Sequence, residues 1–144
     1  MLSLLSQSLE QTETIAIEFS KRLKVGDTIA LCGELGSGKT TFVRGLLKGL
    51  GGDKRYEVTS PTFTLMHEYP LPKGTLYHFD FYRLDKKETL LQIDIDDYVG
   101  ENNDNNKGIT VIEWGDKFFG EIPYSYIVSL EIRGEWARAI DIKP

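Results

Sequence analysis

Eight residues in the first third of the chain have the types and the spacing of a phosphate-binding loop. The segment from Gly33 to Thr40, GELGSGKT, matches the pattern G-x-x-x-x-G-K-[ST]. In such a loop the glycines let backbone N–H groups approach phosphate oxygens, and the following helix adds the partial positive charge of its N-terminus. Lys39 would reach the outer phosphates, and the Thr40 hydroxyl would be a ligand for Mg²⁺. The segment therefore predicts a nucleoside triphosphate site, the alternative being a glycine-rich turn ahead of a helix.

Two acidic residues farther along the chain could complete a magnesium-dependent site. Asp80 follows the run 76–79, and Glu113 follows the strand-forming run 109–112. A carboxylate at the end of an apolar strand is costly to bury unpaired, which favours a metal or hydrogen-bond role for both acids. Hydrolysis or phosphoryl transfer needs one group that holds magnesium and one that places the nucleophile. Spacing does not divide these roles, and a partly exposed strand-end acid is the alternative for each.

The tripeptide Ser60-Pro61-Thr62 places two hydroxyl groups around a proline. Proline biases the preceding residue away from helix, so the segment is expected to be a loop. Thr62 could hydrogen-bond the last phosphate or the magnesium shell, and the loop would then respond to the nucleotide. An ordinary Ser-Pro-Thr turn is an equal alternative.

The cysteine and the histidines do not form a metal-ligand pattern. Cys32 is the single cysteine and lies in an apolar run, which indicates a buried, reduced thiol in a cytosolic protein and excludes an internal disulfide. His67 and His78 are eleven residues apart with no further ligand pattern around them, so a zinc site is not predicted.

Strands and helices alternate around the phosphate loop. The apolar run 28–32 predicts a strand before the loop, and apolar residues on one face of 41–50 predict a helix after it. A first helix is predicted for 8–23, and a central strand beside the loop strand for 109–114. The polar run 101–108 predicts an exposed loop.

Shorter elements are predicted in the rest of the chain. Two strands are expected at 63–69 and 75–82, with a hairpin connection between them. A short helix is expected at 85–93 with Asp85 as its N-cap. The alternating residues between 126 and 142 predict a terminal antiparallel hairpin.

Length and composition limit the number of domains and the classes of function that the chain can have. The chain has 144 residues without a break in composition, which favours a single domain over residues 1–144. Its net charge is -5 and its pI about 5.1, so no basic stripe is available for a nucleic-acid backbone, and contact with RNA is expected to be indirect. The segment 1–6 has no basic flank and only a short apolar run, so neither a signal peptide nor a membrane span is predicted. We expect a cytoplasmic protein.

Four motifs together resemble the TsaE family, formerly called YjeE, of small bacterial ATPases in tRNA threonylcarbamoyladenosine biosynthesis. They occupy residues 33–45, 60–65, 78–84 and 112–114, and the resemblance covers nearly the whole chain. It implies an α/β fold of the P-loop NTPase type: a three-layer sandwich whose central sheet is mostly parallel and carries antiparallel hairpins.

The resemblance also implies roles for particular residues. Thr40 and Glu113 would ligate Mg²⁺, Asp80 would assist hydrolysis, and Thr62 would lie in a switch-like loop. The residues implied to contact ATP are Thr62, the loop residues Glu34, Leu35, Gly36, Ser37, Gly38, Lys39, Thr40 and Thr41, and, around the base, Leu9, Thr12, Ala137 and Arg138.

The function implied is that of a weak, partner-stimulated ATPase. In the family the partners are the modification proteins TsaD and TsaB, and ATP turnover would reset their complex. Two alternatives remain open from the residues. A small-molecule kinase would need an Arg-rich lid and an acceptor pocket, and the sequence shows neither. A nucleotide-sensing adaptor would bind ATP without useful hydrolysis.

Overall fold

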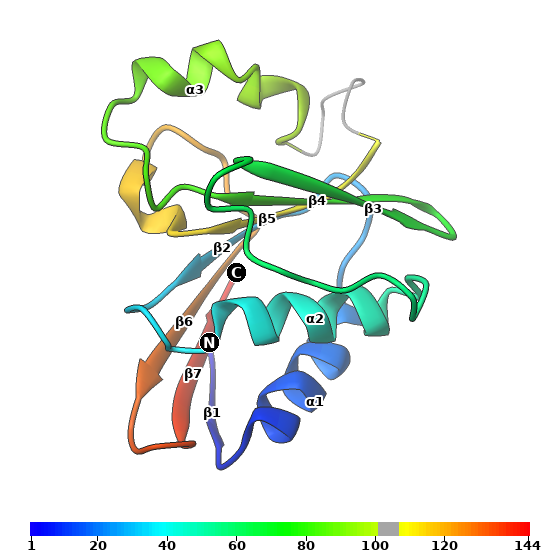
Figure 1. The fold of residues 1–144 in the computed structure, drawn as a ribbon, viewed down its shortest axis with the longest axis vertical. Helices are drawn as coiled ribbons and strands as arrows, with labels where there is room; N and C mark the ends of the chain where they lie inside the picture. The colour runs from blue at the N-terminus through cyan, green and yellow to red at the C-terminus, as the bar shows by residue number, and fades with distance from the viewer. Residues whose placement is uncertain (101–106) are drawn as a thin grey trace.

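A mixed β-sheet runs through the molecule and carries helices on both faces (Figure 1). The computed structural model describes residues 1–100 and 107–144, and within them one sheet has seven strands in the order β1-β7-β6-β2-β5-β4-β3. The strands are β1 (Leu2–Ser6), β2 (Thr28–Cys32), β3 (Met66–Leu71), β4 (Gly74–Asp80), β5 (Gly108–Glu113), β6 (Tyr126–Ile132) and β7 (Arg138–Lys143).

The central strands are parallel and the outer ones antiparallel. β4, β5, β2 and β6 pair in parallel, whereas β3 pairs antiparallel with β4 at one edge, and β7 and β1 add antiparallel strands at the other. Every residue of β5 is buried, as is β2 up to Leu31, as expected for strands covered on both faces. The predicted α/β class, the mostly parallel centre and the terminal hairpin are confirmed.

Two helices cover one face of the sheet, α1 (Leu9–Ser20) and α2 (Lys39–Gly49) (Figure 1). Ser8 caps α1, because its Oγ accepts a hydrogen bond from the Gln11 backbone N–H at 3.1 Å. The two helices approach closely: a Cβ at Gly45 would lie 2.4 Å from the Glu13 carbonyl oxygen, so only glycine fits there. The apolar side chains between these helices and the sheet form the larger core cluster, with Phe42 and Leu46 fully buried in it.

The other face carries shorter elements, namely α3 (Glu88–Gln92), η1 (Ile95–Asp97) and η2 (Gly115–Phe118). Their apolar side chains pack with Phe79, Phe81 and Ile112 in a second core cluster. Tyr77, Phe79 and Phe81 therefore face α3, whereas Leu76 and His78 lie on the α2 side of β4. The chain thus forms the three layers that the fold class implies.

Several predicted boundaries were wrong. Asp85 is not a helix cap: α3 begins at Glu88, Lys87 holds the cap position without a side-chain bond, and Asp85 lies 4.0 Å from the Lys117 ammonium. The strand predicted from residue 63 begins at Met66, because the N–H of Leu65 bonds the Pro61 carbonyl and closes a turn.

The other differences concern the chain ends and the polar run. The first helix ends at Ser20 rather than Leu23. β1 was not predicted at all, and it pairs with β7 at the sheet edge. The predicted loop at 101–108 lies outside the described residues except for its last two, of which Gly108 begins β5. No helix in the described part of the chain is long and apolar enough to cross a membrane.

Candidate nucleotide-binding site

The phosphate loop connects the carboxyl end of β2 to the first turn of α2. Gly38 occupies the N-cap position with φ 104° and ψ 18°, a left-handed conformation in which a side chain would be strained. The helix begins at the next residue, so its free N–H groups open toward the loop. The predicted order of strand, loop and helix is confirmed, and it is the order in which a helix N-terminus can receive a phosphate.

Lys39 lies across the loop with its ammonium group against loop carbonyls. Its Nζ donates hydrogen bonds to the carbonyls of Gly33 at 2.6 Å and Glu34 at 3.0 Å, and it lies 4.1 Å from the centroid of the Trp114 ring. Burial lowers the pKa of the Lys39 ammonium, and the negative charges of Glu113 and, next, Asp80 oppose that shift. The ammonium is therefore held against the loop carbonyls, within the electrostatic influence of the two carboxylates.

Arg138 supports the loop from behind. It begins β7, is 8 % exposed, and donates hydrogen bonds from Nε to the Ser37 carbonyl at 3.1 Å and from Nη2 to the Gly36 carbonyl at 2.9 Å. A planar guanidinium can hold two carbonyls at a fixed separation. Arg138 thus ties the last strand of the sheet to the backbone of the loop.

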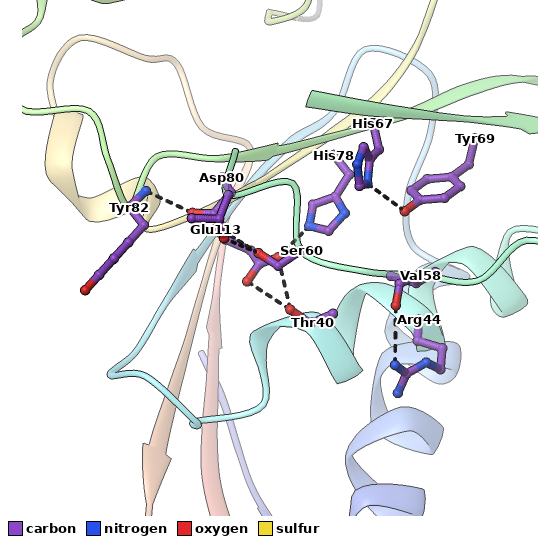
Figure 2. Close-up of polar contacts among 11 residues, drawn as sticks. Thr40, Arg44, Val58, Ser60, His67, Tyr69, His78, Asp80, Tyr82 and Glu113 are labelled. Carbon is purple, nitrogen blue, oxygen red and sulfur yellow. Dashed lines mark hydrogen bonds and ion pairs between the residues drawn. The ribbon is translucent and has the colours of Figure 1, made fainter. Parts of the chain in front are cut away.

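Glu113 ends β5 and faces the first turn of α2 (Figure 2). Its side chain is almost fully buried, and its two carboxylate oxygens accept hydrogen bonds from Thr40 Oγ1 at 3.2 and 3.3 Å. The His78 Nε2 atom lies 2.5 Å from Oε2 of the same carboxylate. The predicted partners Thr40 and Glu113 therefore lie side by side.

Asp80 ends the neighbouring strand β4, directly opposite Glu113 in the register of the sheet. Its Oδ2 accepts hydrogen bonds from Ser60 Oγ and, at 2.9 Å, from Thr62 Oγ1, while Oδ1 accepts one from the Tyr82 backbone N–H at 2.8 Å (Figure 2). The parallel pairing of β4 and β5 brings the two acids to the carboxyl ends of neighbouring central strands. The phosphate loop begins at the same end of the sheet, after β2.

These groups surround a cavity of about 450 Å³. Of the predicted site residues, those that line it are Leu9, Leu35, Gly36, Gly38, Lys39, Thr40, Thr41, Thr62, Asp80 and Glu113. Three residues that were given no role in the sequence analysis also line it, namely Ser60, Tyr82 and Trp114. Each lies one or two residues from a predicted one, and that adjacency is the signal that could have found them.

The remaining predicted residues lie beside or behind the cavity. Thr12 is buried under the loop, where its hydroxyl hydrogen-bonds Ser6 at 2.7 Å. Glu34, Ser37, Ala137 and Arg138 belong to the loop or to its support. Ser37 Oγ is buried without a hydrogen-bond partner among the described residues. The expectation that Ala137 and Arg138 contact a base stays a prediction.

The donor set fits magnesium bound together with phosphates. A hydroxyl and a carboxylate converge at Thr40 and Glu113, and hard cations prefer oxygen ligands of this kind. Among residues 1–100 and 107–144 no group of three or more His, Cys, Asp or Glu side chains could hold a metal ion by itself. Magnesium commonly takes one or two protein ligands and completes its shell with water and phosphate oxygens.

Cys32 is the last residue of β2 and directly precedes the phosphate loop. It is half-buried, where the sequence analysis predicted a buried thiol, and it is a free cysteine. Burial, together with the charge of Asp116, raises the pKa of the Cys32 thiol to about 12. A thiol with so high a pKa is a poor nucleophile at neutral pH, in line with the absence of a chemical role for it in the sequence analysis.

Comparisons with known proteins assign the family. The model of the family "Threonylcarbamoyl adenosine biosynthesis protein TsaE" matches residues 6–140. The chain is 38% identical over 136 residues to the tRNA threonylcarbamoyladenosine biosynthesis protein TsaE of Aquifex aeolicus, covering 94% of this chain and 91% of that protein. It is 37% identical over 138 residues to the TsaE of Treponema pallidum, covering 95% and 96%.

A solved structure has a similar fold. The crystal structure of Bacillus subtilis YdiB superimposes with a TM-score of 0.73 at 29% identity, over 96% of this chain and 82% of that one. The family model and the curated relatives span nearly all of the sequence, including the loop and both acids. The chain therefore belongs to the TsaE family of threonylcarbamoyl adenosine biosynthesis proteins.

Proposed function

We propose that the chain is a magnesium-dependent ATP-binding protein and weak ATPase that supports tRNA threonylcarbamoyladenosine modification by acting on a complex of TsaD and TsaB type. The observation that carries the proposal is the convergence of the phosphate loop with Asp80 and Glu113 around one cavity. The curated relatives are named tRNA threonylcarbamoyladenosine biosynthesis proteins, which supports the biological context.

In this proposal, the position of each residue determines whether it binds phosphate, magnesium or water. Lys39 and the N–H groups at the start of α2 would bind the outer phosphates, while Thr40 and Glu113 would hold Mg²⁺. Bound Mg²⁺ would supply positive charge to the phosphate oxygens as the terminal phosphate is transferred to water. Asp80, on the adjacent strand end, would orient the attacking water.

The contacts of Asp80 give a physical reason for slow turnover. Both of its carboxylate oxygens already accept hydrogen bonds, from Ser60 and Thr62 at one and from the Tyr82 backbone at the other. Three of the roughly four lone-pair sites of the carboxylate are therefore engaged, which reduces the capacity of Asp80 to accept a further hydrogen bond from a water molecule. A partner protein that moves the segment around Ser60 would free Asp80, and hydrolysis would then be partner-stimulated.

The test is phosphate release from ATP by the chain alone and with TsaD and TsaB type proteins. We expect slow release that the partners stimulate, and a loss of stimulated release with Lys39→Ala. Lys21→Ala is the matched control, because this lysine is exposed on the surface and its ion-pair partner among the described residues is Glu18. Multiple-turnover tRNA modification is measured in parallel.

Three outcomes would contradict the proposal. Equal multiple-turnover modification with Lys39→Ala protein would remove the role of ATP binding. Labelled phosphate appearing on a small molecule would indicate a kinase instead. Unchanged modification with Asp80→Ala and Glu113→Ala, with ATP still bound, would indicate an adaptor that needs no hydrolysis.

A further inference from the structure

His78 is a buried polar side chain that the site described above does not use. It lies on β4 two residues before Asp80, is fully buried, and does not line the cavity. The rings of His67 and Tyr69, from the neighbouring strand β3, lie with their centroids 6.3 Å from that of His78 (Figure 2). These rings separate the imidazole from solvent on the side away from the cavity.

The single described partner of His78 is the carboxylate of Glu113. Its Nε2 lies 2.5 Å from Oε2, and because an ionised carboxylate only accepts, the imidazole donates from Nε2–H. Nδ1 is buried without a partner among the described residues.

A buried hydrogen-bond donor fixes the orientation of a carboxylate that is to hold a cation. Among the described residues, the other hydrogen bonds of the carboxylate are those from Thr40 Oγ1, so the imidazole holds Glu113 toward the start of α2. Partners that orient a metal ligand in this way commonly change metal affinity by about tenfold to a hundredfold.

We propose that His78 is a positioning residue that holds the Glu113 carboxylate toward Thr40 and so sets the Mg²⁺ concentration at which nucleotide binding tightens. The inference rests on the proposed function, because it presupposes that Thr40 and Glu113 bind Mg²⁺ together with ATP. His78 acts through Glu113 and does not line the cavity.

The test measures the affinity of a fluorescent ATP analogue as a function of Mg²⁺ concentration, and again in EDTA. The variants are His78→Gln, whose amide nitrogen extends about as far as Nε2, and His78→Asn, which is one methylene shorter. His67→Asn is the matched control, since this neighbouring histidine lies on the same side of the sheet and bonds Tyr69 instead. Affinity in EDTA and thermal unfolding report whether each variant is folded.

We expect His78→Asn to need about tenfold to a hundredfold more Mg²⁺ for the same tightening, with its affinity in EDTA unchanged. His78→Gln is expected to keep most of the wild-type response, and His67→Asn all of it. In a Glu113→Gln background, His78→Asn should cause no further loss, because the group that it positions has gone.

The other outcomes overturn the inference and separate it from the proposed function. A wild-type Mg²⁺ response in His78→Asn, or an equal loss in the Asn and Gln variants, overturns the positioning role alone. A further loss in the Glu113→Gln background does the same. Wild-type protein whose affinity does not depend on Mg²⁺ overturns the proposed function, and the positioning role with it.

Discussion

Glu113 and Asp80 are neighbours in the register of two parallel strands, yet different kinds of structure hold them. The hydrogen-bond partners of Glu113 are Thr40, in the first turn of α2, and His78, in the middle of β4. The side-chain partners of Asp80 are Ser60 and Thr62, which lie in the segment between α2 and β3, outside any helix or strand.

The carboxyl ends of two neighbouring strands can therefore serve different purposes, one at Glu113 and one at Asp80. Partners within helices and strands keep their positions as long as the fold is intact, so the surroundings of Glu113 are fixed. Partners on a connecting segment can leave at the cost of a few hydrogen bonds. The Glu113 region is therefore suited to holding a cation, and the Asp80 region to changing with the state of the site.

The largest effect is expected from replacing Glu113, whose surroundings are fixed. Glu113→Ala should lower partner-stimulated ATP hydrolysis on the order of a thousandfold, because the negative charge at the proposed magnesium position would be lost. It should also abolish the tightening of nucleotide binding by Mg²⁺. Phosphate release and analogue binding measure these effects, and Glu131→Ala, at an exposed position near the end of β6, is the control. Retained Mg²⁺ dependence would show that Glu113 does not hold the cation.

Removing the other acid should separate binding from hydrolysis. Asp80→Ala is expected to lower hydrolysis on the order of a hundredfold, because the group that we propose to orient water would be lost. The affinity for the magnesium–nucleotide complex should stay within about threefold of wild type, because the cation position is intact. The same two assays apply. If affinity falls as far as with Glu113→Ala, the two acids share one role.

A smaller effect is expected from releasing the segment around Ser60 and Thr62 from Asp80 while keeping both acids. Ser60→Ala combined with Thr62→Val removes two hydrogen bonds to a carboxylate, each contributing about 1.5 to 3 kcal/mol. Amide hydrogen exchange over residues 58–65 should be at least about tenfold faster, with β5 unchanged. Thr64→Val, at an exposed position in the same segment, is the control. Equal acceleration in β5 would show that the two regions open together.

The smallest effect concerns the charge of Lys39. The carboxylates of Glu113 and Asp80 raise the pKa of the Lys39 ammonium against the lowering caused by burial, and Glu113 is the stronger of the two. Removing either negative charge should therefore lower the pKa further, more in Glu113→Gln than in Asp80→Asn. Titration of the Lys39 side-chain resonances by NMR measures the order. The reverse order would show that Asp80, rather than Glu113, is the stronger influence on the Lys39 ammonium.

The parts that the sequence predicted best are those whose signals are local. The loop from Gly33 to Thr40, the buried strand before it and the amphipathic helix after it each depend on neighbouring residues. β1 has no such signal, because five residues form a strand there only through pairing with β7, at the far end of the chain. Its register, Leu4 opposite Ile140, is decided by tertiary structure.

The same distinction holds within the site. Asp80 and Glu113 could be singled out because each ends a recognisable apolar run. The contact between His78 and Glu113 joins residues 35 positions apart and depends on the parallel pairing of β4 and β5, which no local pattern encodes. Arg138 was expected near a base from the resemblance, and its hydrogen bonds to the loop carbonyls became visible only with the strand order.

The contact between Arg138 and the phosphate loop also bears on how the site is completed during synthesis. About a hundred residues separate Lys39 from Arg138, and a ribosome that adds about 5 to 20 residues each second needs about 5 to 20 s to make them. Through that interval the loop lacks the guanidinium that holds the carbonyls of Gly36 and Ser37. We expect a nascent chain to acquire its full affinity for nucleotide only when the last strand has joined the sheet. The phosphate loop is synthesised early, but its support from Arg138 forms only near the end of synthesis.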